Sequence, residues 1–464
     1  MANTAVQDQT ELLSAIHAIV GDRGLLTGED ATSRSCDPFR NVLPEGCAIV
    51  RPASTGELSR IMALCHDRGQ RVVVHGGRTG LVGGAYVGPD EIAVSLERMA
   101  RIEEIDSIGS VAIVQAGMTL EGFQNAVAER GLFYPIDLGA KGSATIGGTI
   151  ATNAGGNRVI RWGMTRQNVL GLEAVLADGT IVSSMNRMLK NNTGYDLKHL
   201  FIGSEGTCGI VTRAVLRVVK APRTQLVAFI SVPGYGELIE LLNAAREMPQ
   251  LSAFEVMWRD YYELAAKLGG EYRPVEPDQP YYVLIEAMGY SEDTDNAMFS
   301  AFLENAYEKG LIADAVHASS AKQINDLWRV REGSEILKNE LSPFVGFDVS
   351  VDLRTMEQFL DEVKRTLRER YPIVREATLG HLGDNNIHIG IHVGPDTMAE
   401  EHNIEKCVYD ILKNYDGALT AEHGIGRFKK SFLPEHRRAS EMDLMRTVRT
   451  ALDPDAILNQ DLLF

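Results

Sequence analysis

Two long blocks of small, glycine-rich sequence constrain the fold of this chain more than any other feature. The first, residues 75–84, reads HGGRTGLVGG and directly follows an apolar strand pattern at Val72–Val74. The second, residues 142–156, reads GSATIGGTIATNAGG, and a shorter block, GSEGTCG, follows at 203–209. Glycine lets consecutive backbone N–H groups turn toward one point, where they can bind phosphate. One such loop alone also fits an ordinary turn, but the set favours a backbone wrapped around a large, flat ligand that carries a diphosphate.

These glycines do not match the common nucleotide-binding motifs. The sequence contains neither a G-x-G-x-x-G pattern nor a Walker A pattern. A Rossmann site for NAD and a P-loop are therefore disfavoured.

A second group of chemically reactive residues lies toward the C-terminus. Residues 381–388 read HLGDNNIH, which places His381 and His388 seven positions apart, and Glu422 and His423 follow within AEHGIG. Two imidazoles and one carboxylate can hold a divalent metal and leave coordination positions open for water or substrate. Ordinary packing histidines are the alternative, since the chain has 11 histidines. Arg331, in LWRVRE, can clamp a carboxylate through its planar guanidinium, although its pattern also fits a solvated helix face.

Composition narrows the class of protein. The 464 residues include 46 Lys and Arg against 63 Asp and Glu, and the net charge of −17 argues against nucleic acid or an anionic membrane as the main partner. No apolar run approaches the ~18 residues that span a bilayer, and the N-terminal sequence lacks a signal-peptide pattern. The five cysteines are widely spaced without a CxxC pair. A disulfide framework or a cysteine zinc site is therefore not expected. The cysteine pattern instead favours a reducing, cytoplasmic location.

The chain divides into segments that differ in glycine content and in their helix and strand patterns. Residues 1–44 read as an N-terminal arm that begins with a helix, and residues 45–222 alternate helix and strand patterns with many glycines. Residues 223–415 contain fewer glycines and longer helical patterns between strands, and residues 416–464 read as mainly helical. The pattern is that of an α+β protein.

Local signals mark several elements within these segments. Thr55 is a candidate N-cap for a helix, and Thr119 is a candidate for the next. The stretches Val169–Leu176 and Thr180–Ser183, joined by an Asp-Gly turn, predict a β-hairpin.

These motifs occur together and in order over roughly residues 45–464. The glycine blocks, the stretch KNNTGYDLKHLFIGSEGTCGIVT at 190–212, HLGDNNIH and EHGIG resemble the flavin-dependent 2-hydroxy-acid dehydrogenases of the vanillyl-alcohol-oxidase/p-cresol-methylhydroxylase superfamily. Within it, the chain is similar to the D-lactate and D-2-hydroxyglutarate dehydrogenases. The resemblance implies an FAD-binding domain of p-cresol-methylhydroxylase type and a substrate (cap) domain with an antiparallel sheet and flanking helices. It also implies that residues 416–464 return to the FAD-binding domain.

The resemblance implies FAD as the cofactor. Some relatives attach flavin covalently through a histidine near the first glycine block, where this chain has Thr79, with His75 as the nearest histidine. We therefore expect non-covalent FAD. The positions that match the family's FAD contacts are Gly76, Gly77, Arg78, Thr79, Gly80 and Leu81 for the pyrophosphate, Ser143, Gly147, Gly148, Asn153, Ala154 and Gly156 for the flavin, and Gly209 and Ile210 for the adenine side.

The resemblance also turns the metal hypothesis into an expectation. His381, His388 and Glu422 match the family's ligands for a divalent metal, usually zinc, and His423 matches its catalytic base. The expected reaction oxidises a D-2-hydroxy acid to the 2-oxo acid, with a metal to acidify the hydroxyl group, an imidazole to take the proton and a flavin to take the hydride. Arg331 is expected to contact the substrate.

Three positions depart from the D-2-hydroxyglutarate dehydrogenases that the chain resembles. Gly346 stands where those enzymes carry a lysine for a second substrate carboxylate, Glu335 replaces a hydroxyl residue, and Gly390 replaces an asparagine. A glutamate repels a distal carboxylate, and a lost charged hydrogen bond costs ~1.5–3 kcal/mol. We therefore expect a D-2-hydroxy acid with an uncharged tail, such as D-lactate, with D-2-hydroxyglutarate as the alternative.

Other functions remain open at this level. A flavin enzyme for another alcohol, such as an aryl alcohol, would share the fold, and a zinc hydrolase would use the two histidines and Glu422 to activate water. A non-catalytic FAD subunit of a larger complex is a third class, but such relatives tend to lack the histidine and glutamate set. The missing nicotinamide motif favours an electron-transfer flavoprotein, a cytochrome or a quinone as electron acceptor. Because relatives are often dimers, a homodimer is the expected assembly.

Overall fold

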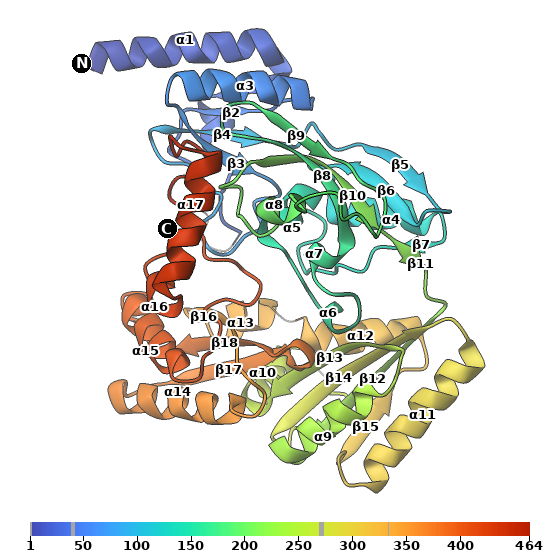
Figure 1. Ribbon diagram of the computed structural model, residues 1–464. Coiled ribbons are helices and arrows are strands. Elements are labelled where there is room, and N and C mark those ends of the chain that lie inside the picture. Colours follow the sequence, from blue (N-terminus) through green and yellow to red (C-terminus); the bar gives the residue numbers. More distant parts are fainter. Residues whose placement is uncertain (1, 39–41, 269–272, 333) are drawn as a thin grey trace. The chain divides into compact units, whose positions relative to one another are not determined.

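The computed structural model describes residues 2–38, 42–268, 273–332 and 334–464. Its internal contacts divide the chain into two units, which are coloured along the sequence in Figure 1. Unit 1 comprises residues 1–155, 163–221 and 422–464, and unit 2 comprises residues 156–162 and 222–421. Most of unit 2, residues 222–421, is therefore inserted in the chain of unit 1, and the short segment 156–162 is a second, smaller insertion.

Unit 1 is built on two main sheets. Its strands are β1 (Leu25–Thr27), β2 (Ala48–Val50), β3 (Arg71–His75), β4 (Glu91–Ser95), β5 (Ile102–Asp106), β6 (Val111–Gln115), β7 (Leu132–Phe133), β8 (Val169–Val175), β9 (Ile181–Ser184), β10 (Ile210–Arg217) and β11 (Val219–Lys220). The first sheet has the order β1-β2-β4-β3, with β2, β4 and β3 parallel. The second is antiparallel with the order β5-β6-β10-β8-β9, and β7 pairs with β11 separately. The predicted hairpin is confirmed as β8 and β9.

Several helices of unit 1 contribute buried apolar side chains to the core around these sheets, and α1 packs on α3. They are α1 (Ala2–Val20), α2 (Glu29–Thr32), α3 (Thr55–Asp67), α4 (Leu120–Ala128), α5 (Ile146–Thr152), α7 (Thr165–Asn168), α8 (Lys198–Phe201), α16 (Leu433–His436) and α17 (Ala439–Leu452), with a 3-10 turn η1 (Asp22–Gly24). Leu12 and Ile16 of α1 are buried in the core of unit 1 together with Leu58 and Ile61 of α3, so the N-terminal arm is part of this unit.

Two sequence predictions in unit 1 were wrong. Ser54, not Thr55, caps α3, because the Ser54 hydroxyl accepts a hydrogen bond from Glu57 N at 3.2 Å while Thr55 donates to Glu173 at 2.8 Å. The last segment is also less helical than predicted, since residues 416–432 contain no helix. The predicted cap at Thr119 is confirmed, because its hydroxyl accepts from Gly122 N at the start of α4.

Unit 2 contains one seven-stranded antiparallel sheet with helices on both faces, as expected. Its strands are β12 (Thr224–Val232), β13 (Leu251–Trp258), β14 (Tyr281–Gly289), β15 (Asp314–His317), β16 (Val345–Ser350), β17 (Arg375–His381) and β18 (Asn386–His392). Its helices are α6 (Val159–Trp162), α9 (Tyr235–Arg246), α10 (Arg259–Leu268), α11 (Glu292–Glu308), α12 (Ala321–Arg331), α13 (Ser334–Glu340), α14 (Met356–Arg370) and α15 (Glu401–Lys413), with a 3-10 turn η2 (Leu382–Asp384). The strand order is β15-β12-β14-β13-β17-β18-β16.

The face of this sheet that carries α10, α12 and α13 is only partly apolar. Tyr261 and Trp328 from the helices pack on Phe229, Met257 and other strand residues. Further along the same face, the strand positions hold acidic and histidine side chains instead. Strand alternation requires that these polar side chains share one face, and this is where the candidate site lies.

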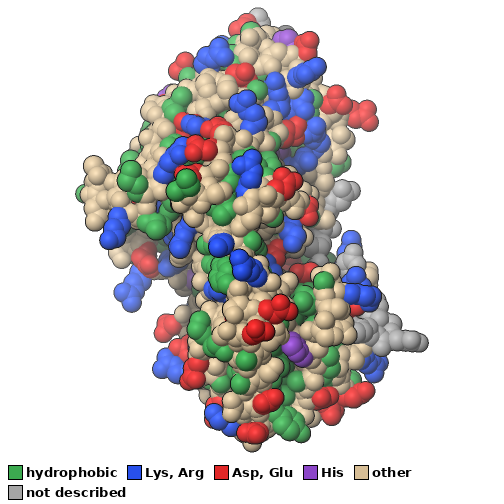
Figure 2. Space-filling view, turned by 90° about the vertical axis from the view of Figure 1, so that its right-hand side faces the viewer, with side chains coloured by type: hydrophobic (Ala, Val, Ile, Leu, Met, Phe, Trp, Pro, Cys, Tyr) green, Lys and Arg blue, Asp and Glu red, His purple; other side chains and the backbone are tan. Residues whose placement is uncertain are grey.

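No helix in the described part of the chain is both long and apolar enough to cross a bilayer. On the face seen in Figure 2, basic and acidic side chains are interspersed. That face therefore lacks the continuous basic surface that nucleic acid would require.

Candidate active site

The first two glycine blocks meet backbone to backbone in unit 1. A Cβ atom on Gly77 would lie against the Ser143 carbonyl, 2.7 Å from its carbon, and 2.9 Å from Ala144 Cα. A Cβ on Gly147 would likewise lie 2.8 Å from Ala116 Cβ. Real Cβ atoms do not approach other atoms this closely, so both positions require glycine. The predicted FAD loops are thus adjacent segments of one surface.

The loop after β3 offers backbone donors that the protein does not use. In the described residues, no N–H group from Gly77 to Leu81 donates a hydrogen bond to the chain. The second block is internally satisfied, since Ile146 N and Gly147 N donate to Met118 O and Ala116 O at 2.9 and 2.7 Å. Consecutive N–H groups without a protein acceptor are the donor set that a diphosphate takes. The first loop therefore fits the pyrophosphate of FAD.

The other predicted flavin contacts lie around α5 and its C-terminal end. Gly148 N donates to the Thr145 hydroxyl, which caps α5. Asn153 ends the helix in the left-handed region, with φ 50°, and accepts from Arg166 N at 2.9 Å. Ala154 O accepts from Thr165 N at 2.9 Å. These bonds fix the second block, which ends where residue 156 begins the short segment of unit 2.

Asn459 joins the third glycine block to β3. Its side-chain oxygen accepts from Val74 N at 2.9 Å, and its amide donates to Glu205 O at 2.7 Å. Next to this turn, Gly209 has φ 152°, and Ile210 is buried at the start of β10. Sequence reasoning missed Asn459, because its partners are distant in the chain.

Glu205 holds the loop that carries Glu422 and His423. Its two carboxylate oxygens accept hydrogen bonds from Ile425 N and Gly426 N, both at 2.8 Å. Burial raises the pKa of Glu205, although the two backbone donors act in the opposite direction. Glu205 was not predicted as a site residue, and its only signal is an acidic residue inside a block of small residues.

His75 is a structural residue of β3. Its Nε2 atom lies 2.8 Å from the carbonyl oxygen of Ala85, and the side chain is buried. Burial lowers the pKa of His75 to about 4, so the ring is neutral at physiological pH. A buried imidazole that is already bonded to the backbone is poorly placed to form a covalent flavin link.

The sheet of unit 2 brings His381 and His388 together. They lie on neighbouring antiparallel strands, and their ring centroids are 5.4 Å apart in an edge-to-face arrangement. One nitrogen from each ring lies within 4.8 Å of the other. The sequence spacing is therefore spanned by a tight turn, which returns the chain on the same face.

Arg331 does not lie on a solvated helix face. Its side chain is 6% exposed, and its Nη2 atom lies 2.6 Å from the carboxylate of Glu255 on β13. The same carboxylate lies 2.9 Å from His381 Nδ1. Burial alone would raise the pKa of Glu255, but the charges of His381 and Arg331 and their hydrogen bonds hold it below its ordinary value. Glu255 was missed by sequence reasoning, although an acid within the apolar strand LSAFEVMW is a signal.

Asp348 plays a similar part beside His388. It is fully buried on β16, and its carboxylate lies 3.8 Å from His388 Nδ1. It also accepts from Asn386 Nδ2 and from the Thr420 hydroxyl, both at 2.9 Å, and its carbonyl accepts from Ala421 N at 3.3 Å. Glu422 is the next residue in the chain after Ala421.

These contacts test whether the histidines suit a metal. Ligand histidines usually present one ring nitrogen to the ion and the other to a carboxylate or carbonyl. Because Nδ1 of His381 and Nδ1 of His388 face carboxylates, Nε2 is the atom that each can offer. The pair therefore fits a divalent cation, with a third ligand still to be supplied.

Two glycines lie beside the histidines on the same face. Gly346 is directly opposite Gly390, as Asp348 is opposite His388. A Cβ on Gly390 would lie 2.9 Å from Leu341 Cδ2, and one on Gly346 would lie 3.6 Å from Phe344 Cε2. The flank of the site is thus small and apolar. The side chain of Glu335, on α13, lies outside the described residues.

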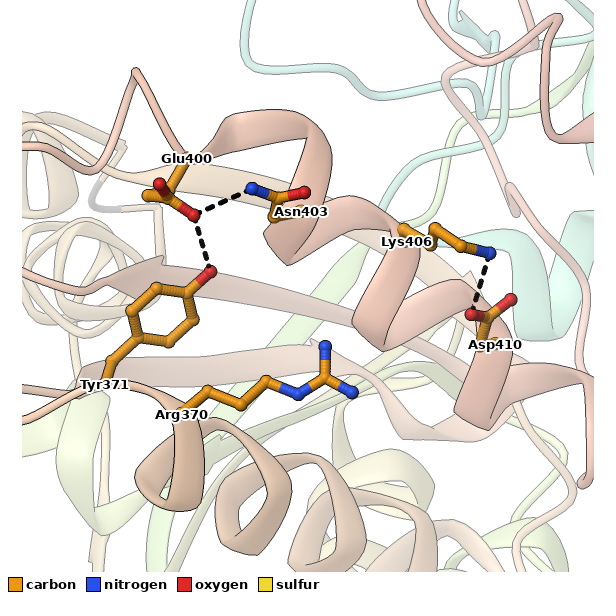
Figure 3. A pocket seen from close by; sticks show the side chains of 6 residues that line it. All are labelled: Arg370, Tyr371, Glu400, Asn403, Lys406 and Asp410. Carbon is orange, nitrogen blue, oxygen red and sulfur yellow. Dashed lines mark hydrogen bonds and ion pairs between the residues drawn. The ribbon is translucent and has the colours of Figure 1, made fainter.

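A pocket of about 390 Å³ on unit 2 is separate from these residues. It is lined by Arg370, Tyr371, Glu400, Asn403, Lys406 and Asp410. Figure 3 shows that Tyr371 and Asn403 both bond Glu400, while Lys406 pairs with Asp410. Most of the polar side chains that line this pocket are bonded to one another, and no predicted site residue contributes to the lining.

Models of known protein families match both the segment with the first two glycine blocks and the segment with the histidine pair. Residues 47–184 match an FAD binding domain, and residues 221–461 match the C-terminal domain of FAD linked oxidases. The chain belongs to the FAD-linked oxidase family. Membership in this family argues against the zinc hydrolase alternative, because FAD takes no part in zinc-catalysed hydrolysis.

Relatives of this FAD-linked oxidase are named for hydroxy-acid oxidation. A probable mitochondrial D-2-hydroxyglutarate dehydrogenase of Oryza sativa subsp. indica is 39% identical, covering 96% of this chain and 80% of that protein. A D-2-hydroxyglutarate dehydrogenase of Xanthomonas citri pv. viticola is 38% identical over 92% and 91%. A putative mitochondrial D-lactate dehydrogenase of Schizosaccharomyces pombe is 37% identical over 88% and 80%.

Solved structures share the fold. p-Cresol methylhydroxylase with bound substrate matches 98% of this chain and 96% of its own, with a TM-score of 0.76 and 15% identity. Alkyldihydroxyacetonephosphate synthase matches 97% and 85%, with a TM-score of 0.74 and 17% identity. The expected two-domain FAD-binding fold, like that of p-cresol methylhydroxylase, is confirmed.

Proposed function

We propose that this FAD-linked oxidase is a dehydrogenase that oxidises a D-2-hydroxy acid to the 2-oxo acid. The observation that carries the proposal is the pair His381 and His388, backed by buried carboxylates, in a chain with an FAD-binding domain. The names of the rice and Xanthomonas relatives support the same class of reaction. The electrons would pass to a carrier other than NAD, such as an electron-transfer flavoprotein, a cytochrome or a quinone.

FAD would supply the hydride acceptor when bound. The backbone N–H groups from Gly77 to Leu81 would hold its diphosphate, because they have no acceptor in the described chain. Residues of the second block would line the flavin, and Gly209 and Ile210 would approach the adenine. The buried, bonded state of His75 supports non-covalent binding.

His381, His388 and Glu422 would hold a divalent metal, with zinc as the first candidate. Such an ion would supply Lewis-acid stabilisation of the substrate hydroxyl oxygen. His423, next to Glu422, would accept the hydroxyl proton. Arg331 would bind the substrate carboxylate through the guanidinium N–H groups that do not face Glu255, since a guanidinium has five donors.

The test is a panel of D- and L-2-hydroxy acids with an artificial electron-accepting dye. We expect turnover of D enantiomers, loss of turnover after dialysis against a chelator, and recovery with zinc or manganese. Preference for L enantiomers would contradict the stereochemical assignment. Full activity after exhaustive chelation would remove the metal from the proposal.

We propose further that the favoured substrate has an uncharged tail, as D-lactate does. The flank formed by Gly346, Gly390, Leu341 and Phe344 supports this, because none of these four residues carries a positive charge for a second carboxylate. D-2-hydroxyglutarate is the second candidate, since it is the acid in the names of the rice and Xanthomonas relatives.

Gly346→Lys should shift this preference. The position is exposed and its nearest neighbour on the Cβ side is Phe344 at 3.6 Å, so a long side chain can be accommodated. A new charged hydrogen bond, worth ~1.5–3 kcal/mol, should raise kcat/KM for D-2-hydroxyglutarate by about tenfold or more relative to D-lactate. Gly346→Met, similar in length but uncharged, is the control. Equal effects of the two substitutions would show that charge at this position does not select the substrate.

A further inference from the structure

The carboxylate of Glu255 contacts two side chains that have different roles in the proposed reaction, a metal ligand and a substrate-binding arginine. Its carboxylate, 1% exposed, lies 2.9 Å from Nδ1 of His381, a proposed metal ligand. It also lies 2.6 Å from Nη2 of Arg331, the proposed substrate clamp. The three side chains come from β13, β17 and the last residue of α12, so no local sequence motif brings them together.

The strand register explains why one carboxylate can reach both partners. Glu255 pairs directly with His381 between β13 and β17, so the two side chains stand on the same face. Arg331 is fixed from the other side, because its carbonyl accepts from the Tyr261 hydroxyl at 3.1 Å. Burying a carboxylate is costly unless it is paired and hydrogen-bonded, and here both partners are cationic or can become so.

We infer that Glu255 is a positioning residue that fixes His381 for metal binding and Arg331 for substrate binding at the same time. A carboxylate behind a ligand histidine holds the ring orientation and makes the opposite nitrogen a better donor. The same carboxylate holds the guanidinium near the histidine pair. This inference rests on the metal site of the proposed function.

The neighbouring strand provides a matched control. Glu286 on β14 is also fully buried and also pairs with an arginine, Arg158, at 2.9 Å. Its carboxylate also accepts hydrogen bonds from Gln225 and Ser252, and neither of these is a residue of the proposed metal site. Glu286→Gln therefore removes a buried charge beside an arginine without touching His381.

The experiment measures zinc affinity of the FAD-loaded protein by competition with a chromophoric chelator. We expect Glu255→Gln to weaken zinc binding by about 10–100-fold, the usual effect of losing such a partner, and Glu286→Gln to leave it unchanged. Turnover of Glu255→Gln should recover in part at saturating zinc, which a folding defect would not allow. Glu255→Asp, whose shorter side chain cannot span the same gap, serves as the second variant if Glu255→Gln does not fold.

Each outcome separates this inference from the proposed function. If the wild-type protein binds neither zinc nor manganese, the metal site fails and this inference fails with it. If the wild type binds zinc and a folded Glu255 variant binds it equally well, only the role of Glu255 is overturned. Equal weakening by Glu286→Gln would also overturn it, because the effect would then be general to buried acids on this sheet.

Discussion

His423→Asn should abolish most turnover while the purified protein stays yellow. Asparagine is close to histidine in size but cannot accept a proton at neutral pH. Loss of a general base typically costs 10²–10⁴-fold in rate, and we expect a loss in that range. The loop should keep its position, because the substitution leaves in place the hydrogen bonds from the backbone N–H groups of Ile425 and Gly426 to the Glu205 carboxylate.

The measurement is steady-state turnover with a D-2-hydroxy acid and an artificial acceptor, alongside the visible flavin spectrum. His17→Asn is the control, because His17 lies on the exposed side of α1 beside Asp22. Turnover of His423→Asn equal to that of the control would remove His423 from the role of base. Loss of the yellow colour would instead indicate that the residue supports cofactor binding.

Gly77→Ala should cost the protein its flavin. The added methyl group would meet backbone atoms, the Ser143 carbonyl and Ala144 Cα, and backbone cannot swing aside as a flexible side chain can. The two glycine blocks would have to separate, which displaces the free N–H groups that suit a diphosphate. Overpacking of this kind costs up to about 3 kcal/mol, and we expect a lower melting temperature in addition to flavin loss.

The flavin-to-protein ratio and thermal unfolding check this prediction. Gly56→Ala is the matched control, since a Cβ at that position would have no heavy atom within 4 Å. In the first turn of α3, alanine should be neutral or slightly stabilising. Full flavin loading of Gly77→Ala with an unchanged melting temperature would show that the two blocks can yield without loss of function.

The parts of the fold that the sequence predicts are those encoded by neighbouring residues. The β8–β9 hairpin follows from an Asp-Gly turn between apolar strands, and the glycine blocks follow from their composition. His381 and His388 are near enough in the chain for their relation to be visible as a spacing. The C-terminal segment was predicted poorly, because the loop around His423 is held by the carboxylate of Glu205 and not by helical hydrogen bonds.

The supporting residues of the site could not be read in the same way. Glu255 lies 126 positions from His381, and Asp348 lies 38 positions from Asn386. Their partnerships arise from strand register, which depends on the whole sheet. The sequence predicts Thr55 as the N-cap of α3, whereas the structure has Ser54 in that role. Both residue types can cap a helix, and here the Thr55 hydroxyl is bonded to Glu173, a residue far away in the sequence.

The end of the chain completes the sheet on which the cofactor loop is mounted. Leu458 bridges to Val72, and Asn459 accepts from Val74 N, a bond between residues 385 positions apart. This edge of β3 is therefore paired only after residues 458 and 459 have been synthesised, later than every strand of the two units. Stable capture of a dinucleotide should depend on this late segment, and a variant truncated before Leu458 should be purified without colour.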